Sequence, residues 1–278
     1  MKLKYNSPED WMLGMSTCAF SELSFESLKK CSEAGVNCIE LGFTNEGFEA
    51  ISENGRKYLG KIAGLVRQNG LTLWSGHMPY FGNWSIDTPD NEIRTRSVKN
   101  CCELLEMGAG VGMSKMVIHP SSEIQDHEDR DLHMKFSKES LCILNEKAKC
   151  LQIQLAVEVL PRSCLANTST EMLKLIAGIE GVGICCDMNH LLQESAVEFI
   201  KKTGNRIVTT HVSDYDGIDE RHWLPGKGIN NWQEIVHVLV NAGYTGPFMY
   251  EVRNIQDTGP ITALDIVENW NAILQSSK

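Results

Sequence analysis

Four short segments decide the fold of this chain, and each is an apolar run that leads to one metal-capable side chain. The segments are LAVEVL (155–160), ICCDMNH (184–190), VTTHVSD (208–214) and FMYEVR (248–253). Their metal-capable residues are Glu158, Asp187, His211 and Glu251, which are separated by 29, 24 and 40 residues. This spacing is typical of successive strand–helix units. In a closed (β/α)8 barrel the carboxyl ends of all strands share one rim, so we expect the four side chains to converge there.

The rest of the chain repeats the same alternation of strands and helices. Predicted strands cover residues 12–20, 37–43, 71–79, 114–122, 154–160, 182–190, 206–215 and 246–253. Predicted helices cover residues 25–35, 52–69, a stretch ending near 107, 128–150, 170–177, 192–203, 231–242 and 261–275. The strands lack polar alternation, which is expected when both faces of a sheet are buried. We therefore predict the α/β class, with a single (β/α)8 TIM barrel domain spanning residues 1–278.

Composition and charge argue against nucleic acid and membranes as partners of this protein. The chain has a net charge of −10 and a pI near 5.3, which argues against binding nucleic acid through bulk electrostatics. No segment approaches the roughly 20 apolar residues of a membrane span, and MKLKYNSPEDW (1–11) lacks the apolar region of a secretory signal. Ten scattered cysteines without a CxxC pair predict buried thiols in a reducing cytoplasm. The sequence leaves the oligomeric state open, and a homo-oligomer is compatible with it.

The motifs resemble those of the xylose-isomerase-like barrel superfamily of sugar isomerases and epimerases. They are VEV with Glu158, DMNH with Asp187 and His190, HVSD with His211, RHWLPGKGINNW (221–232) and GYTGPFMYEV (243–252) with Glu251. In the ketose 3-epimerases that these motifs look like, the matching Glu, Asp, His and Glu bind one divalent ion, often manganese. The resemblance thus implies one divalent metal ion here, with manganese favoured. Magnesium, cobalt or zinc also suits a donor set of three carboxylates and one imidazole.

The resemblance also implies the reaction and its substrate, a small sugar or sugar phosphate. Isomerisation or epimerisation would proceed by proton transfer through a metal-stabilised enediolate. Glu158 and Glu251 would be the catalytic pair, one removing a proton from carbon and the other returning one. Because coordination to a cation lowers the basicity of a carboxylate, acidification of the substrate and close positioning must contribute.

Five further residues are candidates for substrate binding. His190 matches the DxxH contact to substrate hydroxyls in the similar enzymes, although it could equally cap the following helix. Arg221 and His222 lie in the long loop before the PGKG turn, where the alternative is a solvated loop charge. His77 and His119 end the third and fourth predicted strands and would form a polar pocket wall.

Two other enzyme classes remain open alternatives, as does a sugar-binding barrel without catalysis. A metal-dependent dehydratase of a polyol or keto-inositol would use the same enediolate chemistry. Endonuclease IV, a trinuclear zinc enzyme of the same superfamily that cuts abasic DNA, has a ligand pattern that this chain nearly matches. The matching residues are His77, His119-Pro120, Glu158, Asp187-x-x-His190, His211, Glu220-x-His222 and Glu251, with Glu220 replacing an aspartate. The acidic charge and the lack of clustered Arg and Lys in the rim loops weigh against this class.

Overall fold

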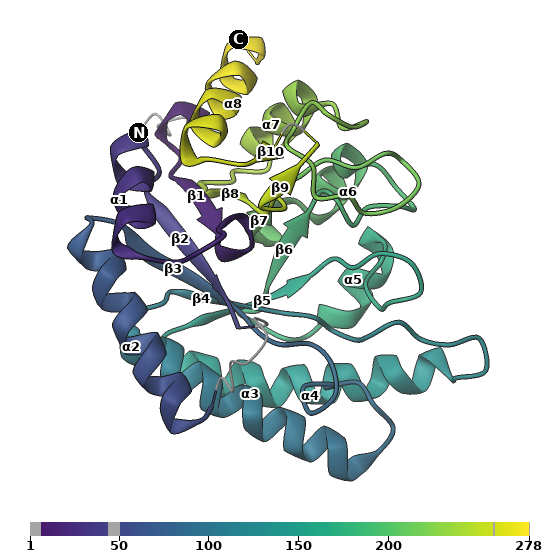
Figure 1. Cartoon of the computed structure of the whole chain (residues 1–278). Coiled ribbons are helices and arrows are strands. Elements are labelled where there is room, and N and C mark those ends of the chain that lie inside the picture. Colours follow the sequence, from purple (N-terminus) through teal and green to yellow (C-terminus); the bar gives the residue numbers. More distant parts are fainter. Residues whose placement is uncertain (1–6, 44–50, 258, 278) are drawn as a thin grey trace, which may run out of the picture.

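The computed structural model describes residues 7–43, 51–257 and 259–277 and contains eight parallel strands with eight α-helices (Figure 1). The prediction that MKLKYNSPEDW is not a secretory signal falls in part outside the described residues, because these begin at residue 7. The barrel strands are β1 Leu13–Ser16, β2 Cys38–Gly42, β3 Thr72–His77, β4 Lys115–Ile118, β5 Gln154–Glu158, β6 Gly183–Asp187, β7 Ile207–His211 and β8 Phe248–Tyr250. The helices are α1 Phe25–Ala34, α2 Glu53–Gln68, α3 Asn91–Val111, α4 Arg130–Cys150, α5 Ser169–Ile176, α6 Ala196–Thr203, α7 Trp232–Asn241 and α8 Ala263–Ser276.

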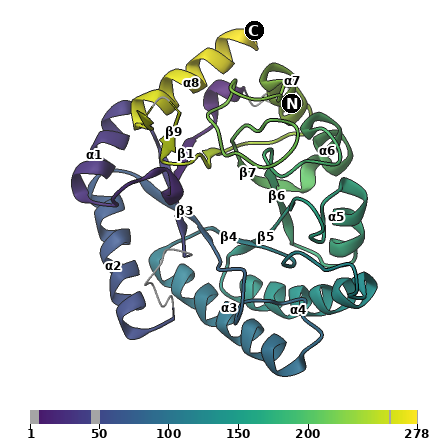
Figure 2. The same ribbon diagram turned by 45° about the vertical axis from the view of Figure 1, so that its right-hand side comes forward.

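The strands form a nearly closed ring with the helices outside it (Figure 2). The strand order runs from β7 through β6, β5, β4, β3, β2 and β1 to β8, and every neighbouring pair in it is parallel. Val212 closes the ring between β7 and β8. Its N–H donates to the carbonyl of Met249 at 2.7 Å, and its carbonyl accepts from the N–H of Glu251 at 3.1 Å. The predicted (β/α)8 barrel is therefore confirmed.

Side-chain caps account for the starts of the eight α-helices in the described part of the chain. Each of the eight α-helices begins after a residue whose side chain accepts a backbone N–H of the first turn, which satisfies one of its free donors. These residues are Ser24, Ser52, Asp90, Asp129, Thr168, Ser195, Asn231 and Thr262. The cap at Ser195 explains why α6 begins at Ala196 and not at the predicted residue 192. Gly35, the last residue of the predicted helix 25–35, is the C-cap of α1, with a φ of 111° that favours glycine.

The first strand is shorter than the sequence predicts. Residues 12–20 are an apolar run, yet β1 ends at Ser16 and a 3-10 turn, η2, covers Thr17–Ala19. The turn is held by Thr17, whose hydroxyl accepts the N–H of Gly42 at 2.9 Å. Two further short strands, β9 Ile255–Gln256 and β10 Gly259–Pro260, form an antiparallel pair outside the barrel sheet. The remaining 3-10 turns are η1 Pro8–Asp10 and η3 Gly204–Arg206.

Two glycine substitutions should shift stability in opposite directions. A Cβ added at Gly183 on β6 would lie 2.2 Å from a methyl carbon of Val208 on β7 and 2.9 Å from its Cβ. We expect Gly183→Ala to destabilise the barrel by about 1–3 kcal/mol, as overpacking does. An added Cβ at Gly60, in the interior of α2, meets no atom within 4 Å. Gly60→Ala should stabilise by about 0.5–1 kcal/mol through helix propensity. Urea unfolding midpoints measure both effects. A midpoint of Gly183→Ala equal to that of the wild-type chain would contradict the tight contact between β6 and β7.

Candidate active site

The structure brings the four predicted metal ligands together at the carboxyl ends of the strands. Glu158, Asp187 and His211 are the last residues of β5, β6 and β7, and Glu251 directly follows β8. One ligand atom of each lies within 4.8 Å of the others. The Nδ1 of His211 lies 2.9 Å from Glu158 Oε1, 3.3 Å from Glu251 Oε2 and 3.8 Å from Asp187 Oδ2. The convergence follows from the barrel, which places the ends of consecutive parallel strands side by side.

The donor set of this quartet fits a divalent cation. Asp187 Oδ2 is buried and has no hydrogen-bond partner among the described residues, with only the Nδ1 atoms of His190 and His211 at ion-pair distance, and a buried carboxylate oxygen without a hydrogen bond is costly. Burial raises the pKa of Glu251 to about 8, opposed by His211 and reinforced by the negative charges of Asp187 and Glu158. A cation within reach of one atom from each residue would be bound by Asp187 Oδ2 and would neutralise the repulsion among the three carboxylates. Glu158, Asp187, His211 and Glu251 are therefore the residues that could hold a metal ion.

Two histidines hold the second oxygen of Glu158. The Nε2 atoms of His77 and His119 lie 2.8 Å and 2.9 Å from Glu158 Oε2. Burial opposes ionisation of Glu158, but the positive potential of His211, His119 and His77 outweighs it and holds its pKa well below the usual value. Burial also lowers the pKa of His119, to about 4, whereas the Glu158 contact raises that of His77 to about 9 against the effect of burial. Both predicted pocket histidines thus lie beside a catalytic candidate.

His190 and His222 form a second group beside the quartet, together with Glu220. The Nδ1 of His190 lies 3.2 Å from Asp187 Oδ2, and its Nε2 lies 3.1 Å from Glu220 Oε2. His222 contacts the backbone carbonyl of Glu251 through Nδ1 at 3.2 Å. The alternative role of His190 as a helix cap is excluded, because Ser195 caps α6.

Arg221 is not brought into the pocket. Its Nε donates to Asp216 Oδ2 at 2.7 Å, its side chain is 40% exposed, and it does not line the cavity. The arginines that line the pocket are Arg162 and Arg253. Arg162 forms ion pairs with Glu123, Asp219 and Glu220, and its contact with Glu220 is 3.0 Å long.

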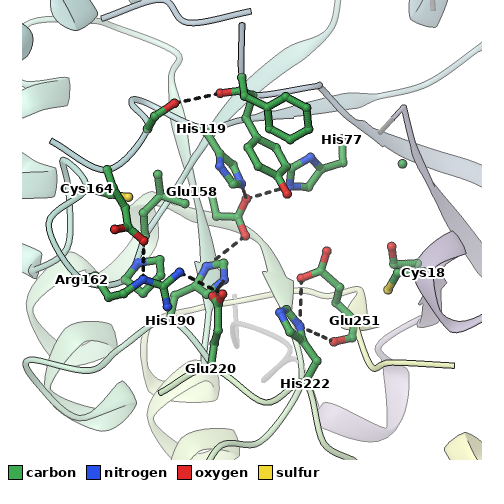
Figure 3. Close-up of a pocket in the computed structure, with 18 of the residues that line it drawn as sticks. Cys18, His77, His119, Glu158, Arg162, Cys164, His190, Glu220, His222 and Glu251 are labelled. Carbon is green, nitrogen blue, oxygen red and sulfur yellow. Dashed lines mark hydrogen bonds and ion pairs between the residues drawn. The ribbon is translucent and has the colours of Figure 1, made fainter. Parts of the chain in front are cut away.

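The quartet and the second group (His190, Glu220 and His222) open into one cavity of about 570 Å³ (Figure 3). His77, His119 and Glu158 lie on one side of it and Glu251 and His222 on another, so their polar atoms face a shared space. The wall also contains apolar and aromatic side chains, namely Tyr80, Phe81, Leu160 and Pro161. The ring of Tyr80 stacks on His119 with centroids 4.1 Å apart. A cavity of this size with convergent polar groups suits a small-molecule ligand.

Sequence reasoning missed one buried acid at this site. Glu40 on β2 is fully buried, and its Oε1 lies 2.8 Å from the Nε2 of His211. Its Oε2 accepts the hydroxyl of Ser75 at 2.7 Å. The available signal was a single charged residue inside the apolar strand NCIELGF, because such a residue needs a buried partner. Arg162, Tyr80 and Phe81 were also missed, since they lie in loops without a distinctive pattern.

Comparisons with known proteins agree with the barrel fold. The family described as "Xylose isomerase-like TIM barrel" matches residues 28–273. An uncharacterized protein of Methanocaldococcus jannaschii is 25% identical and covers 92% of this chain and 90% of its own length. Fructoselysine 3-epimerase of Escherichia coli O157:H7 is 22% identical over 67% of this chain and 56% of its own. A probable endonuclease 4 of Aster yellows witches'-broom phytoplasma is 23% identical over 70% and 74% of the two chains.

The solved structures share the fold. The crystal structure of a D-tagatose 3-epimerase-like protein superposes with a TM-score of 0.80 at 23% identity, over 96% of this chain and 98% of that one. The structure of D-psicose 3-epimerase with D-tagatose from Clostridium cellulolyticum H10 gives a TM-score of 0.77 at 18% identity, over 96% and 98% of the two chains.

Proposed function

The chain belongs to the xylose isomerase-like TIM barrel family, and on this basis we propose that it is a divalent-metal-dependent isomerase or epimerase of a sugar or sugar phosphate. The observation that carries the proposal is the convergence of Glu158, Asp187, His211 and Glu251 at the barrel rim. Relatives named as fructoselysine 3-epimerase and D-psicose 3-epimerase support a small sugar as substrate.

The proposed metal ion supplies electrostatic chemistry: when bound, it draws electron density from the carbonyl and adjacent hydroxyl of a ketose and so acidifies the neighbouring C–H bond. We favour manganese, with magnesium, cobalt and zinc compatible with the same donors. The ligands would be the four residues of the quartet, in which the Nδ1 of His211 faces the carboxylates of the other three.

The protein's own groups then move the proton. Glu158 and Glu251 approach the shared cavity from β5 and β8 on different sides (Figure 3). One carboxylate would remove the proton from carbon and the other would return one to the opposite face or the adjacent carbon. His77 and His119 orient Glu158 through its Oε2, while His190 and His222 face the cavity and can hydrogen-bond to sugar hydroxyls.

We also propose that the protein acts in the cytoplasm. All ten cysteines are free, which supports a reducing cytoplasm. No helix among the described residues is long and apolar enough to cross a membrane.

Solvent isotope exchange tests the proposed reaction. A panel of free and phosphorylated ketoses would be incubated in D2O with the enzyme and added manganese. We expect one substrate to gain deuterium at the carbon next to its carbonyl and to be converted to an isomer or epimer. Chelation of the metal should abolish the exchange, and manganese should restore it. A product lighter by one water would instead indicate a dehydratase. No exchange or turnover across the panel would count against the proposal.

A second candidate, a three-zinc phosphodiesterase acting on abasic DNA, is favoured by one specific observation. Besides the quartet, the groups His77, His119, Glu158 and His190, Glu220, His222 each place three ligand atoms within 4.8 Å of one another. The probable endonuclease 4 among the relatives supports this reading. The net charge of −10 opposes it, since gripping a DNA backbone needs several cationic contacts. Three zinc ions per chain together with cleavage of an abasic duplex would overturn the sugar proposal.

A further inference from the structure

The carboxylate of Glu40 lies behind the metal-binding quartet, on the far side of His211. It belongs to β2, is fully buried, and does not line the cavity. We propose that Glu40 is a positioning residue for the metal centre, holding the Nε2–H of His211 so that the Nδ1 lone pair faces the other three ligands. This inference rests on the proposed metal-dependent function and adds a group that neither contacts the substrate nor binds the ion.

The two ring nitrogens of His211 face different partners. Only Nδ1 is close to Glu158, Asp187 and Glu251, at 2.9–3.8 Å, whereas Nε2 lies 2.8 Å from Glu40 Oε1. A neutral imidazole carries one proton, and the nitrogen that binds a metal must be the unprotonated one. Nδ1 is also hydrogen-bonded to Glu158 Oε1 at 2.9 Å, so metal binding through Nδ1 requires that this hydrogen bond is given up and that the proton lies on Nε2, where Glu40 is the adjacent acceptor. Carboxylates in this position orient ligating histidines and increase their basicity.

Glu40 Oε1 faces His211 Nε2, and the buried thiol of Cys185 also lies beside the His211 ring. Glu40 Oε1 and His211 Nε2 are at ion-pair distance without the alignment of a regular hydrogen bond, and both are buried without any other hydrogen-bond partner in the described part of the chain. The other oxygen of Glu40 is held by the hydroxyl of Ser75 at 2.7 Å. Since buried donors and acceptors are nearly always paired, rotation of the imidazole into line with Oε1 is the arrangement that satisfies both atoms.

A purely structural role is the competing explanation, in which Glu40 only links β2 to Ser75 on β3. That role predicts a change in folding stability and no change in metal coordination. The proposed role predicts a change in metal affinity and in the ligand field even when the metal-free variant is as stable as the wild-type chain. Direct metal binding separates the two without a known sugar substrate.

Titration calorimetry with Mn²⁺ and the visible spectrum of the Co²⁺-loaded protein provide the test. We expect Glu40→Gln, which keeps the shape of the side chain, to raise the Kd for Mn²⁺ about 10-fold, and Glu40→Leu about 100-fold, within the range for such outer partners of metal ligands. The Co²⁺ spectrum should change in both variants. Ser75→Ala is the matched control, because it removes the contact to the other oxygen and leaves Oε1 beside His211. Its Kd should stay within about threefold of wild type, well below that range.

The outcomes are distinguishable. If Glu40→Leu fails to fold, Glu40→Gln decides. Wild-type Kd and an unchanged Co²⁺ spectrum in folded Glu40→Gln would overturn the positioning role while leaving the proposed function intact. An equal loss of affinity in Ser75→Ala would also overturn it, because affinity would then follow general loosening of the core. If the wild-type chain binds neither Mn²⁺ nor Co²⁺, both the metal centre and the role of Glu40 are rejected.

Discussion

Glu251→Gln is expected to lower kcat by about 10²–10⁴-fold at saturating metal, the range for loss of a general acid or base. Glu251 is the one member of the quartet whose side chain remains partly exposed, at 14%, and it lines the cavity. Glutamine preserves its shape and one oxygen that can contact the ion, but it cannot take up a proton from carbon. Metal affinity measured on the same variant would separate loss of the ion from loss of proton transfer.

Glu158→Gln should reduce kcat to a similar extent and also weaken metal binding. Its Oε1 accepts from His211, and its Oε2 accepts from His77 and lies 2.9 Å from His119 Nε2, so the neutral amide would present its NH2 group to one of these imidazoles. Glu139→Gln on the exposed face of α4 is the matched control and should leave kcat unchanged. If Glu158→Gln and Glu251→Gln both retained full activity, the two-carboxylate mechanism would be wrong.

Asp214→Asn is expected to destabilise the fold by about 3 kcal/mol, because buried donors would lose a charged acceptor. Asp214 is fully buried after β7, and its Oδ2 accepts the indole N–H of Trp232 at 2.9 Å and the backbone N–H of Gly226 at 2.8 Å. Its Oδ1 accepts from the N–H groups of Tyr215 and Asn230. In asparagine an NH2 group replaces one of the two carboxylate oxygens. This NH2 group would face two N–H donors and could not accept a hydrogen bond from either.

Thermal unfolding and urea midpoints measure this loss, with Asp257→Asn on an exposed loop as control. The loop pinned by Asp214 also carries Glu220 and His222, so metal affinity or turnover should fall together with stability. A midpoint equal to that of wild type would show that the loop from residue 215 to 230 is held by other contacts.

The barrel and the metal quartet could be predicted because their signals are local. A strand buried on both faces reads as an apolar run, and one charged residue at its carboxyl end stands out against that run. Helix starts were harder to place, as the late start of α6 after Ser195 shows, because several polar residues precede the first buried turn. The end of β1 at Ser16 was also missed, since Thr17 leaves the strand in order to bond with Gly42 on the next one.

The contacts that loop residues make around the metal quartet could not be predicted from the sequence. Arg221 and Arg162 are similar in sequence terms, as single arginines in loops, yet only Arg162 lines the cavity. Their partners differ: Arg221 pairs with Asp216, which does not line the cavity, whereas Arg162 pairs with Glu220, which does. Charge pairing between loops is set by the packing of the whole rim.

By itself, then, the sequence determined the parallel barrel and the four residues that meet at its rim, because strand periodicity and the ring topology dictate where strand ends converge. Only the tertiary structure decided which groups stand behind and around those four. Glu40 is 171 residues from His211 in the chain and beside it in space. Contacts across a closed barrel join strands that are distant in sequence, and a buried donor or acceptor chooses its partner by proximity after folding, which no local pattern encodes.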